Sequence, residues 1–503
     1  MKHFYFKELC AALTLLLMPS VLMALEKDGE IYLISTANDL IEFAKQVNNG
    51  EAFDIYGYAD AKLTADIDLR GHESEFPLIG TVEHQYKGTF DGQQHTITYN
   101  LVSTAESCGL FAHLGGTVRN LYLDGTLRVN HNYAGSIAGT AYFPAIIEQC
   151  HSRVKIIADG GDYIGGLVGH ATGFEGPPYI RVTNCIYSGH IMGFAFHFAG
   201  IVAWANVSTV VKNCLMTAPI DTDVTQMSGH VIADGSRRST TDNITYAGIV
   251  NCYFVYPYGT PEPYGATQVT MEQVESGEVC CLLNWDENIY NAASHLTIFR
   301  QNLGEDKFPV FDGTHGLVKE ITSTGYASFA PGYVEDGYNH FIVPEGVEAY
   351  TGTLSENTLL MHAAGNVIGG GNGNGYVLKG APGFYSFMPT SEELAKVEND
   401  FDGGSGTIDT RYASYYLLDD KDGVVGFYRL KSGEGFDSHL AFLVNPPTNE
   451  EMLPLNFDEV NAIQAVQSAQ QGDESSIYNL SGLRLKNTTK GIYIINGKKV
   501  FGR

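Results

Sequence analysis

The stretch Gly165-Gly166-Leu167-Val168-Gly169, with Asn184-Cys185-Ile186-Tyr187-Ser188-Gly189 after it, decides the fold because both of its parts recur along the N-terminal half of the chain. A core of two small residues and two apolar residues occurs four times, with its third residue at positions 110, 137, 167 and 201, and a weaker fifth copy has its third residue at 231. These positions are 27, 30, 34 and 30 residues apart. A second column follows each core, in which Asn or Gln precedes one of Leu121, Cys150, Cys185, Cys214 and Cys252.

Two columns kept in the same order over five copies indicate a stack of similar structural units, because loops between fixed short strands tolerate changes in length. Repeats of this length, rich in Gly, Val, Ile and Tyr, are too short and too poor in helix formers for helical repeats. We therefore predict an all-β protein in which residues 30–260 form a right-handed β-solenoid. The predicted repeat core consists of Gly109, Gly135, Gly165, Gly166, Gly200, Cys150, Cys185, Cys214 and Cys252.

The cysteines of the second column have a structural interpretation in such a stack. Equivalent positions of neighbouring repeats lie about 4.8 Å apart and point the same way. Parallel side chains do not have the crossed geometry of a disulfide. We predict a ladder of buried thiols with Leu121 as a further rung. The alternative is a string of metal-binding thiolates, although no Cys-x-x-Cys pair is present.

The repeat motifs at 165–169 and 184–189 resemble the GLUG motif of bacterial cell-surface proteins. The segments at 63–69, 76–80 and 88–97 are similar to the first rungs that precede GLUG repeats in that family. The resemblance covers residues 30–260 and implies a surface protein of Gram-negative anaerobes with a β-helix-like fold.

One helix is predicted at the start of the solenoid, over residues 37–49. Thr36 and Asp39 form a plausible capping pair before it, and Gly50 ends it. We expect this helix to cover the open edge of the first coil, whose backbone groups would otherwise be unpaired. Its apolar stripe consists of Leu40, Ile41, Phe43, Ala44 and Val47.

The sequence changes character after residue 265. Residues 265–315 are predicted to close the solenoid, beginning with one short amphipathic helix from Met271 to Leu283. Residues 316–445 contain short β-rich segments separated by Gly and Pro, which predict an antiparallel β-sandwich-like module. Residues 446–475 begin with two prolines and are rich in Gln, as in a flexible linker.

The last segment, 476–503, predicts two alternating strands, the second with an Asn-Gly hairpin turn. It is similar to short C-terminal domains of exported proteins and resembles the sorting domains of type IX secretion. The resemblance implies that secretion or anchoring machinery is a partner of this small β domain. The residues that carry it are Gly491, Tyr493, Asn496 and Gly497.

The N-terminus predicts export. Residues 1–24 combine two lysines, an apolar stretch and a small residue at Ala24, as in a cleavable signal peptide. No later stretch is long and apolar enough to predict a transmembrane helix. The net charge of −27 opposes binding to nucleic acid and keeps an exported protein soluble. We predict a protein of the cell surface, the outer membrane or the extracellular space.

The chain contains none of the common catalytic motifs, so we predict no catalytic residue, cofactor or metal. The alternative enzyme is one that cleaves polysaccharides in a β-helix groove, with Asp66, Asp68 and Asp91 as its carboxylates. Turn-forming or solvated carboxylates are the simpler interpretation of these three residues.

Four aromatic residues suggest where a ligand could bind. Tyr253, Phe254, Tyr256 and Tyr258 could stack on sugar rings, although sealing of the last coil is the simpler interpretation. The function predicted from the sequence is binding or adhesion without catalysis, with a glycan or a surface protein as partner. The alternatives are the polysaccharide-active enzyme and a structural component of a surface layer.

Overall fold

The computed structural model describes residues 25–51, 58–173, 180–207, 209–222, 228–233, 247–258, 265–284, 298–331, 340–370, 374–403, 413–433 and 440–457, and four short strands between 477 and 502. The predicted signal peptide lies outside the described residues, as do residues 458–475 of the predicted linker. The described part is mostly β-strand, which confirms the all-β class. It divides into two compact units, residues 1–250 with 256–265 (unit 1) and residues 251–255 with 266–503 (unit 2).

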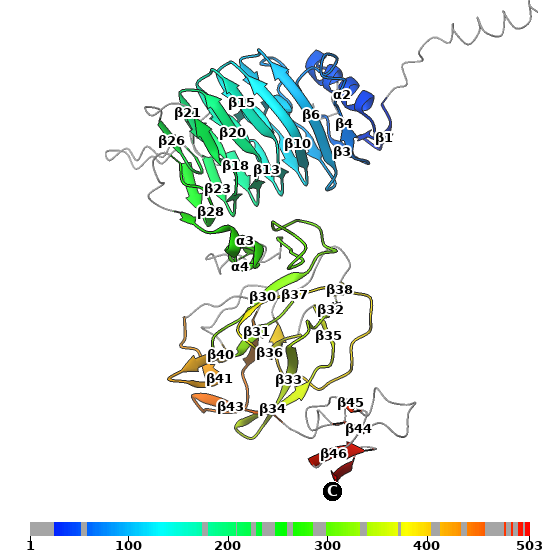
Figure 1. Ribbon diagram of the computed structural model, residues 1–503, viewed down its shortest axis with the longest axis vertical. Helices are drawn as coiled ribbons and strands as arrows, with labels where there is room; N and C mark the ends of the chain where they lie inside the picture. Colours follow the sequence, from blue (N-terminus) through cyan, green and yellow to red (C-terminus); the bar gives the residue numbers. More distant parts are fainter. Residues whose placement is uncertain are drawn as a thin grey trace, which may run out of the picture. The chain divides into compact units, whose positions relative to one another are not determined.

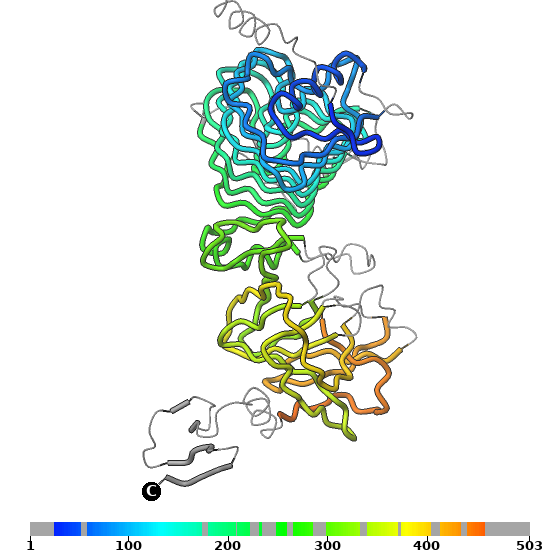
Figure 2. The backbone as a smooth tube through the Cα atoms, turned by 90° about the vertical axis from the view of Figure 1, so that its right-hand side faces the viewer, coloured from blue at the N-terminus to red at the C-terminus, as the bar shows by residue number. Residues whose placement is uncertain are grey.

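The strands of unit 1 pair in parallel with strands about one repeat away (Figure 1). Ala138 is opposite Val168, and Ile147 is opposite Val182. Figure 2 shows the backbone paths of successive repeats side by side. One nine-stranded sheet, parallel except for its first pair, has the order β1 (Lys27–Asp28), β2 (Ile31–Ile34), β3 (Ala61–Leu63), β5 (Thr89–Asp91), β9 (Thr117–Arg119), β13 (Ile146–Glu148), β18 (Ile180–Thr183), β23 (Thr209–Lys212) and β27 (Ala247–Val250).

Three further sheets of unit 1 are also parallel. The largest contains β4 (Ile67–Asp68), β6 (Thr96–Ser103), β10 (Tyr122–Val129), β14 (His151–Ser152), β15 (Lys155–Asp159), β19 (Ile186–Tyr187), β20 (His190–Phe194), β24 (Leu215–Met216) and β25 (Ile220–Thr222). The other two are β7 (Ser107–Cys108), β11 (Tyr133–Ala134), β16 (Tyr163–Gly165), β21 (His197–Ala199) and β26 (Ser228–His230), and β8 (Phe111–Leu114), β12 (Ala138–Tyr142), β17 (Val168–Thr172) and β22 (Val202–Ala205).

Both sequence columns have a steric reason. A Cβ at Gly166 would collide with the carbonyl oxygen of Gly200 and with the ring of Tyr187, so a glycine is needed where repeats approach closely. In the second column, the residue before each thiol or Leu121 has a positive φ, a conformation that Asn adopts more easily than most residues. These residues are Asn120, Gln149, Asn184, Asn213 and Asn251, with φ between 50° and 55°.

Helix α2 (Ala37–Asn49) begins and ends as predicted. The hydroxyl of Thr36 accepts a hydrogen bond from the backbone N of Asp39, whose carboxylate accepts one from the backbone N of Thr36. Gly50 follows in the left-handed conformation. The buried ring of Phe43 packs at 5.4 Å from the ring centre of Tyr32 and 6.2 Å from that of Phe90, so the helix covers the first strands of unit 1.

Unit 2 begins with the parallel strands β28 (Cys252–Phe254) and β29 (Ala266–Gln268). The single helix predicted from Met271 to Leu283 is wrong, because the structure has two, α3 (Met271–Glu275) and α4 (Glu278–Asn284). Gly277 between them has a φ of +89°, which a continuous helix cannot contain.

The main sheet of unit 2 has nine described strands. The pair β34 and β43 is parallel, so the predicted purely antiparallel module is wrong in that respect. The boundary predicted at residue 445 is also wrong, because Leu453 of β43 is buried in this sheet. The order is β31 (Tyr326–Phe329), β36 (Tyr376–Gly380), β33 (Val347–Ser355), β34 (Thr358–Ala363), β43 (Met452–Phe457), β41 (Val424–Arg429), β40 (Tyr415–Lys421), β42 (Ala441–Val444) and β39 (Asp402–Gly403).

Smaller antiparallel sheets complete unit 2. They are β30 (Leu317–Ile321) with β37 (Gly383–Phe387), β35 (Val367–Gly369) with β32 (His340–Ile342) and β38 (Pro389–Thr390), and the C-terminal β45 (Arg484–Leu485), β44 (Ile477–Tyr478), β46 (Gly491–Ile495) and β47 (Lys498–Gly502).

The C-terminal segment has four described strands where two were predicted. Ile495 pairs with Lys498, which leaves two residues for the connection between β46 and β47. Those residues, Asn496 and Gly497, lie outside the described part, so the predicted turn stays a prediction.

Candidate functional site

Aromatic side chains form two neighbouring columns on unit 1. In the first, Tyr133 of β11 is in register with Tyr163 of β16, which is in register with His197 of β21. In the second, Thr140 of β12 lies between His113 of β8 and His170 of β17, and Trp204 of β22 follows. The six rings are half-buried, so each keeps one part in solvent.

The rings of both columns stack on one another, and we call Tyr133, Tyr163, His170, His197 and Trp204 the aromatic stack. The centre of the Tyr133 ring lies 4.6 Å from that of His170 and 5.8 Å from that of Tyr163, with nearly parallel planes. Tyr163 stacks in turn on His197 at 4.7 Å and contacts Trp204 at 5.1 Å. Inside the stack the faces of the rings are therefore largely covered by other rings.

The stack ends at Tyr133. Its partner in the preceding repeat is Ser107, which has no ring to place over it. Ser107 is turned inward, where its hydroxyl donates to the carbonyl of Ala112 at 2.6 Å and lies 2.8 Å from the hydroxyl of Thr140. The ring contacts of Tyr133 within the described part of unit 1 are to Tyr163 and His170, both from the next repeat. The face of Tyr133 toward Ser107 is therefore not covered by a ring.

A hollow of about 740 Å³, which we call the groove, lies where the stack ends. Its size is typical of small-molecule sites. Its lining residues include the aromatic side chains Tyr133, His113, Tyr142 and His170, the hydroxyl residues Ser107, Thr140 and Thr172, and the acidic residues Glu83 and Glu106. Apolar faces and hydroxyl or carboxylate oxygens therefore converge on one space.

The loop at 77–83 forms part of the groove lining. Helix α2 holds this loop in place. The side chain of Asn48 donates to the carbonyl of Leu78 at 2.9 Å and accepts from the backbone N of Gly80 at 2.7 Å. The ring of His84 lies 2.8 Å from the Asn48 carbonyl. Ile79 of this loop bridges Phe111 of the neighbouring strand β8. On the same strand, the ring nitrogen Nδ1 of His113 lies 3.0 Å from the hydroxyl of Tyr142, which joins β8 to β12.

The histidines of the groove are neutral at neutral pH. Burial lowers the pKa of His170 to about 4. Burial also lowers the pKa of His113, and this effect exceeds the opposing influence of Glu106 and Glu83. Burial, followed by the charge of Glu106, raises the pKa of both Tyr133 and Tyr142. At neutral pH the charges of the groove are therefore those of its carboxylates.

The thiols of the second sequence column are buried and free of disulfides. The sulfur of Cys185 donates to the carbonyls of Thr183 and Ile147 at 3.2 and 3.8 Å, and Cys150 and Cys214 make equivalent bonds. Burial, and then the neighbouring thiols, raises the pKa of Cys185 well above its usual value. A metal-binding string needs thiolates, which these surroundings disfavour. No described His, Cys, Asp and Glu side chains form a metal-binding group of three or more.

The three carboxylates considered for a hydrolase are each engaged with a partner of their own. Asp66 pairs with His95, the exposed Asp68 pairs with Arg70 at 2.7 Å, and the buried Asp91 pairs with Arg119 at 2.9 Å. Each has its own partner in unit 1, as expected of structural carboxylates.

Two of the four predicted sugar-stacking aromatics cannot serve that role. Tyr253 and Phe254 of β28 are 8% and 7% exposed, so neither ring offers a free face to a sugar. In unit 1, Tyr258 lies edge-on to the buried ring of Phe198, and Tyr256 is 45% exposed. The prediction is therefore wrong for Tyr253 and Phe254.

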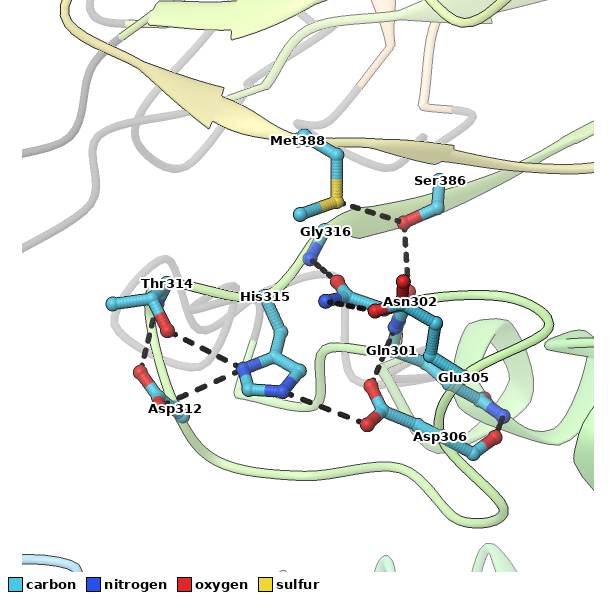
Figure 3. Close-up of polar contacts among 10 residues, drawn as sticks. All are labelled: Gln301, Asn302, Glu305, Asp306, Asp312, Thr314, His315, Gly316, Ser386 and Met388. Carbon is cyan, nitrogen blue, oxygen red and sulfur yellow. Dashed lines mark hydrogen bonds and ion pairs between the residues drawn. The ribbon is translucent and has the colours of Figure 1, made fainter.

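A polar cluster in unit 2 surrounds His315 (Figure 3). Its Nε2 lies 3.5 Å from Asp306 and its Nδ1 lies 3.6 Å from Asp312. The backbone N of Asn302 donates to the Asp306 carboxylate at 2.6 Å, and the Asn302 side chain accepts from the backbone N of Gly316. These contacts close the irregular segment at 301–316 on itself.

Ser386 of β37 is the nearest candidate nucleophile in this cluster. Its hydroxyl donates to the backbone carbonyl of Gln301 at 2.7 Å and also approaches the sulfur of Met388 (Figure 3). It forms no hydrogen bond to His315 in the described structure, so the pair lacks the contact that activates a serine. The cluster fastens the segment to β37.

Sequence reasoning missed the groove and the aromatic stack, although a positional pattern marks them. Tyr133, Tyr163 and His197 each stand four residues before the third residue of a repeat core. His170 and Trp204 each stand three residues after it. Aligning the repeats on that residue would have revealed both columns.

Fold and site together define an all-β protein with a parallel stack of repeats and a surface groove lined by aromatic and acidic side chains. No protein-family model matches the chain. A stretch of 128 residues is 28% identical to Halomucin of Haloquadratum walsbyi, and the match covers 25% of this chain and 1% of that protein.

Among solved structures, the chain is similar to a Bacteroides ovatus protein described as a candidate immunoglobulin A1 protease. The likeness covers 57% of this chain and 93% of the other, with 19% identity and a TM-score of 0.41. At that score it supports no statement about fold or activity. None of the described helices is long and apolar enough to cross a membrane.

Proposed function

We propose that this protein is an exported cell-surface protein without catalytic activity, which binds glycans in the groove at the end of the aromatic stack. The groove carries the proposal because its lining combines Tyr133, one face of which no other ring covers, with hydroxyl-bearing and acidic residues. Sugar rings have apolar faces that pack on aromatic rings and polar edges that form hydrogen bonds. Both kinds of partner line the groove.

The proposal includes the finer reading of the fold, a right-handed β-solenoid of the GLUG type over residues 30–260. Parallel pairing at the repeat distance and the close approach at Gly166 support it. The C-terminal residues 476–503 would serve secretion or anchoring, with Gly491 and Tyr493 in a described hairpin. Glycans of a host or of a neighbouring cell are then the partners.

Glu83 and Glu106 favour a second candidate function, the cleavage of a glycan bound in the groove. Most glycosidases use two carboxylic residues on either side of the bond that they cleave. Both side chains are exposed, however, whereas the acid of a glycosidase is kept protonated by apolar surroundings. Release of new reducing ends from a bound oligosaccharide would support this candidate over simple binding.

Binding by the full chain tests the proposal. We expect a glycan array to show selective binding, and Tyr133→Ala to weaken the best interaction at least about tenfold, or 1.4 kcal/mol. Phe194→Ala is the matched control, since Phe194 is an exposed aromatic of unit 1 outside the groove lining. Thermal unfolding of both variants checks that they are folded. A wild-type protein that binds no glycan above background would refute the proposal.

A further inference from the structure

The charged side chains that line the groove are all negative. Glu83 and Glu106 line it, and its lining contains neither Lys nor Arg. Its two histidines are neutral at neutral pH, because burial lowers the pKa of both His113 and His170. A ligand in the groove therefore meets negative charge without a compensating cation from the lining.

Glu106 lies among the rings of the groove. Its charge acts on Tyr133 and Tyr142 and also on His113, so it is close to the rings of three different strands. Its Oε1 accepts a long hydrogen bond of 3.4 Å from the side chain of Asn132. Because that contact is weak and the side chain is exposed, the carboxylate can still accept a hydrogen bond from a ligand.

Carboxylates beside aromatic faces recognise ammonium groups. A cation is attracted to the face of a Tyr ring, and a charge-assisted hydrogen bond to a carboxylate adds direction to that attraction. Tyr133, one face of which no other ring covers, and Glu106 both line the groove. Acidic sugars would instead be repelled by two unneutralised carboxylates.

We propose that the groove selects saccharides that carry a free, protonated amine, and that the carboxylate of Glu106 binds this ammonium group. The inference rests on the proposed glycan binding and narrows it to amino sugars without an acetyl group. Glu83, in the loop at 77–83, adds to the negative charge of the groove. Tyr133 supplies the surface on which the amino sugar ring lies.

The test compares a β-1,4-linked glucosamine oligomer with its N-acetylated counterpart, using the full chain and calorimetry at pH about 6. An amine of ordinary basicity is protonated there, whereas His170, with a pKa of about 4, stays neutral. We expect the wild type to bind the glucosamine oligomer at least about tenfold more tightly. Glu106→Gln should abolish this preference, while binding of the N-acetylated oligomer changes little.

Glu148→Gln is the control for a general loss of negative charge, since Glu148 lies on β13 and does not line the groove. It should leave the preference unchanged. If the wild type binds both oligomers equally, the amine selectivity is wrong while glycan binding stands. If it binds neither these oligomers nor any glycan on an array, the proposed function itself fails. A lysine-rich peptide that competes as well as the glucosamine oligomer would overturn the assignment to sugars.

Discussion

The two units build β-structure from opposite kinds of pairing. In unit 1, β6 and β10 pair in parallel over eight residues, with Thr96 opposite Tyr122. In unit 2, β33 and β34 are consecutive strands that pair antiparallel, with Ser355 opposite Thr358. Parallel pairing at the repeat distance aligns equivalent residues of different repeats, whereas a hairpin aligns unrelated neighbours. Columns of like side chains, such as the aromatic stack, therefore form in unit 1.

The same difference separates how the units are stabilised. Each repeat of unit 1 is held by its neighbours, through close backbone approaches and the buried ladder of thiols. In the described part of unit 2, two clusters of buried side chains from distant segments form the core. One contains Phe329, Phe341, Leu378 and Phe387, and the other contains Leu359, Phe401, Tyr416, Phe427 and Leu453.

The largest effect is expected from a cavity in unit 2. Phe427 is fully buried and stacks on Phe401 at 4.7 Å with nearly parallel planes. Phe427→Ala should lower the free energy of unfolding of unit 2 by about 3–5 kcal/mol. Hydrogen exchange read peptide by peptide should show faster exchange in unit 2 and unchanged exchange in unit 1. Val424→Ala, at a half-exposed site on the same strand, is the control. Equally faster hydrogen exchange in both units would contradict the view that the two units are stabilised separately.

A smaller loss is expected from overpacking between two repeats of unit 1. In Gly166→Ala the new methyl group would meet the Gly200 carbonyl and the Tyr187 ring, at a cost of about 3 kcal/mol. Gly248→Ala is the control, because its nearest atom is 3.8 Å away. Urea unfolding should separate the two variants. If both are equally stable, close approach does not explain the glycine column.

Acid should destabilise unit 1 through a buried histidine. Burial, followed by the charge of Arg153, lowers the pKa of His151 to about 3. The unfolded chain takes up this proton below its ordinary pKa of about 6.5, so stability is complete above that pH and declines as the pH falls toward 3. The loss from this residue is about 2 kcal/mol between pH 6.5 and 5. His151→Gln can keep the hydrogen bond to Ser188 and should flatten the profile. A variant that remains as acid-sensitive as the wild type would contradict the assignment.

The sequence predicts best those features that repeat or depend on near neighbours. Helix α2 follows from Thr36, Asp39 and Gly50, which act within a few residues of one another. Strand β43 was not predicted, because it is buried only through its pairing with β34 and β41. Both of these strands are distant from it in sequence. The groove escaped for another reason. The groove lies where one repeat has Ser107 and the next has Tyr133. That these two residues are partners is known only from the strand pairing of the structure.

The parallel register of unit 1 also bears on how such a chain can evolve. A duplicated stretch of one repeat length would enter between existing strands and offer each neighbour the pairing partner it already has. Such an insertion would lengthen the stack by about 4.8 Å and leave its ends intact. Because Tyr133 lies at one end of the aromatic stack, repeats added beyond its other end would lengthen unit 1 without rebuilding the groove.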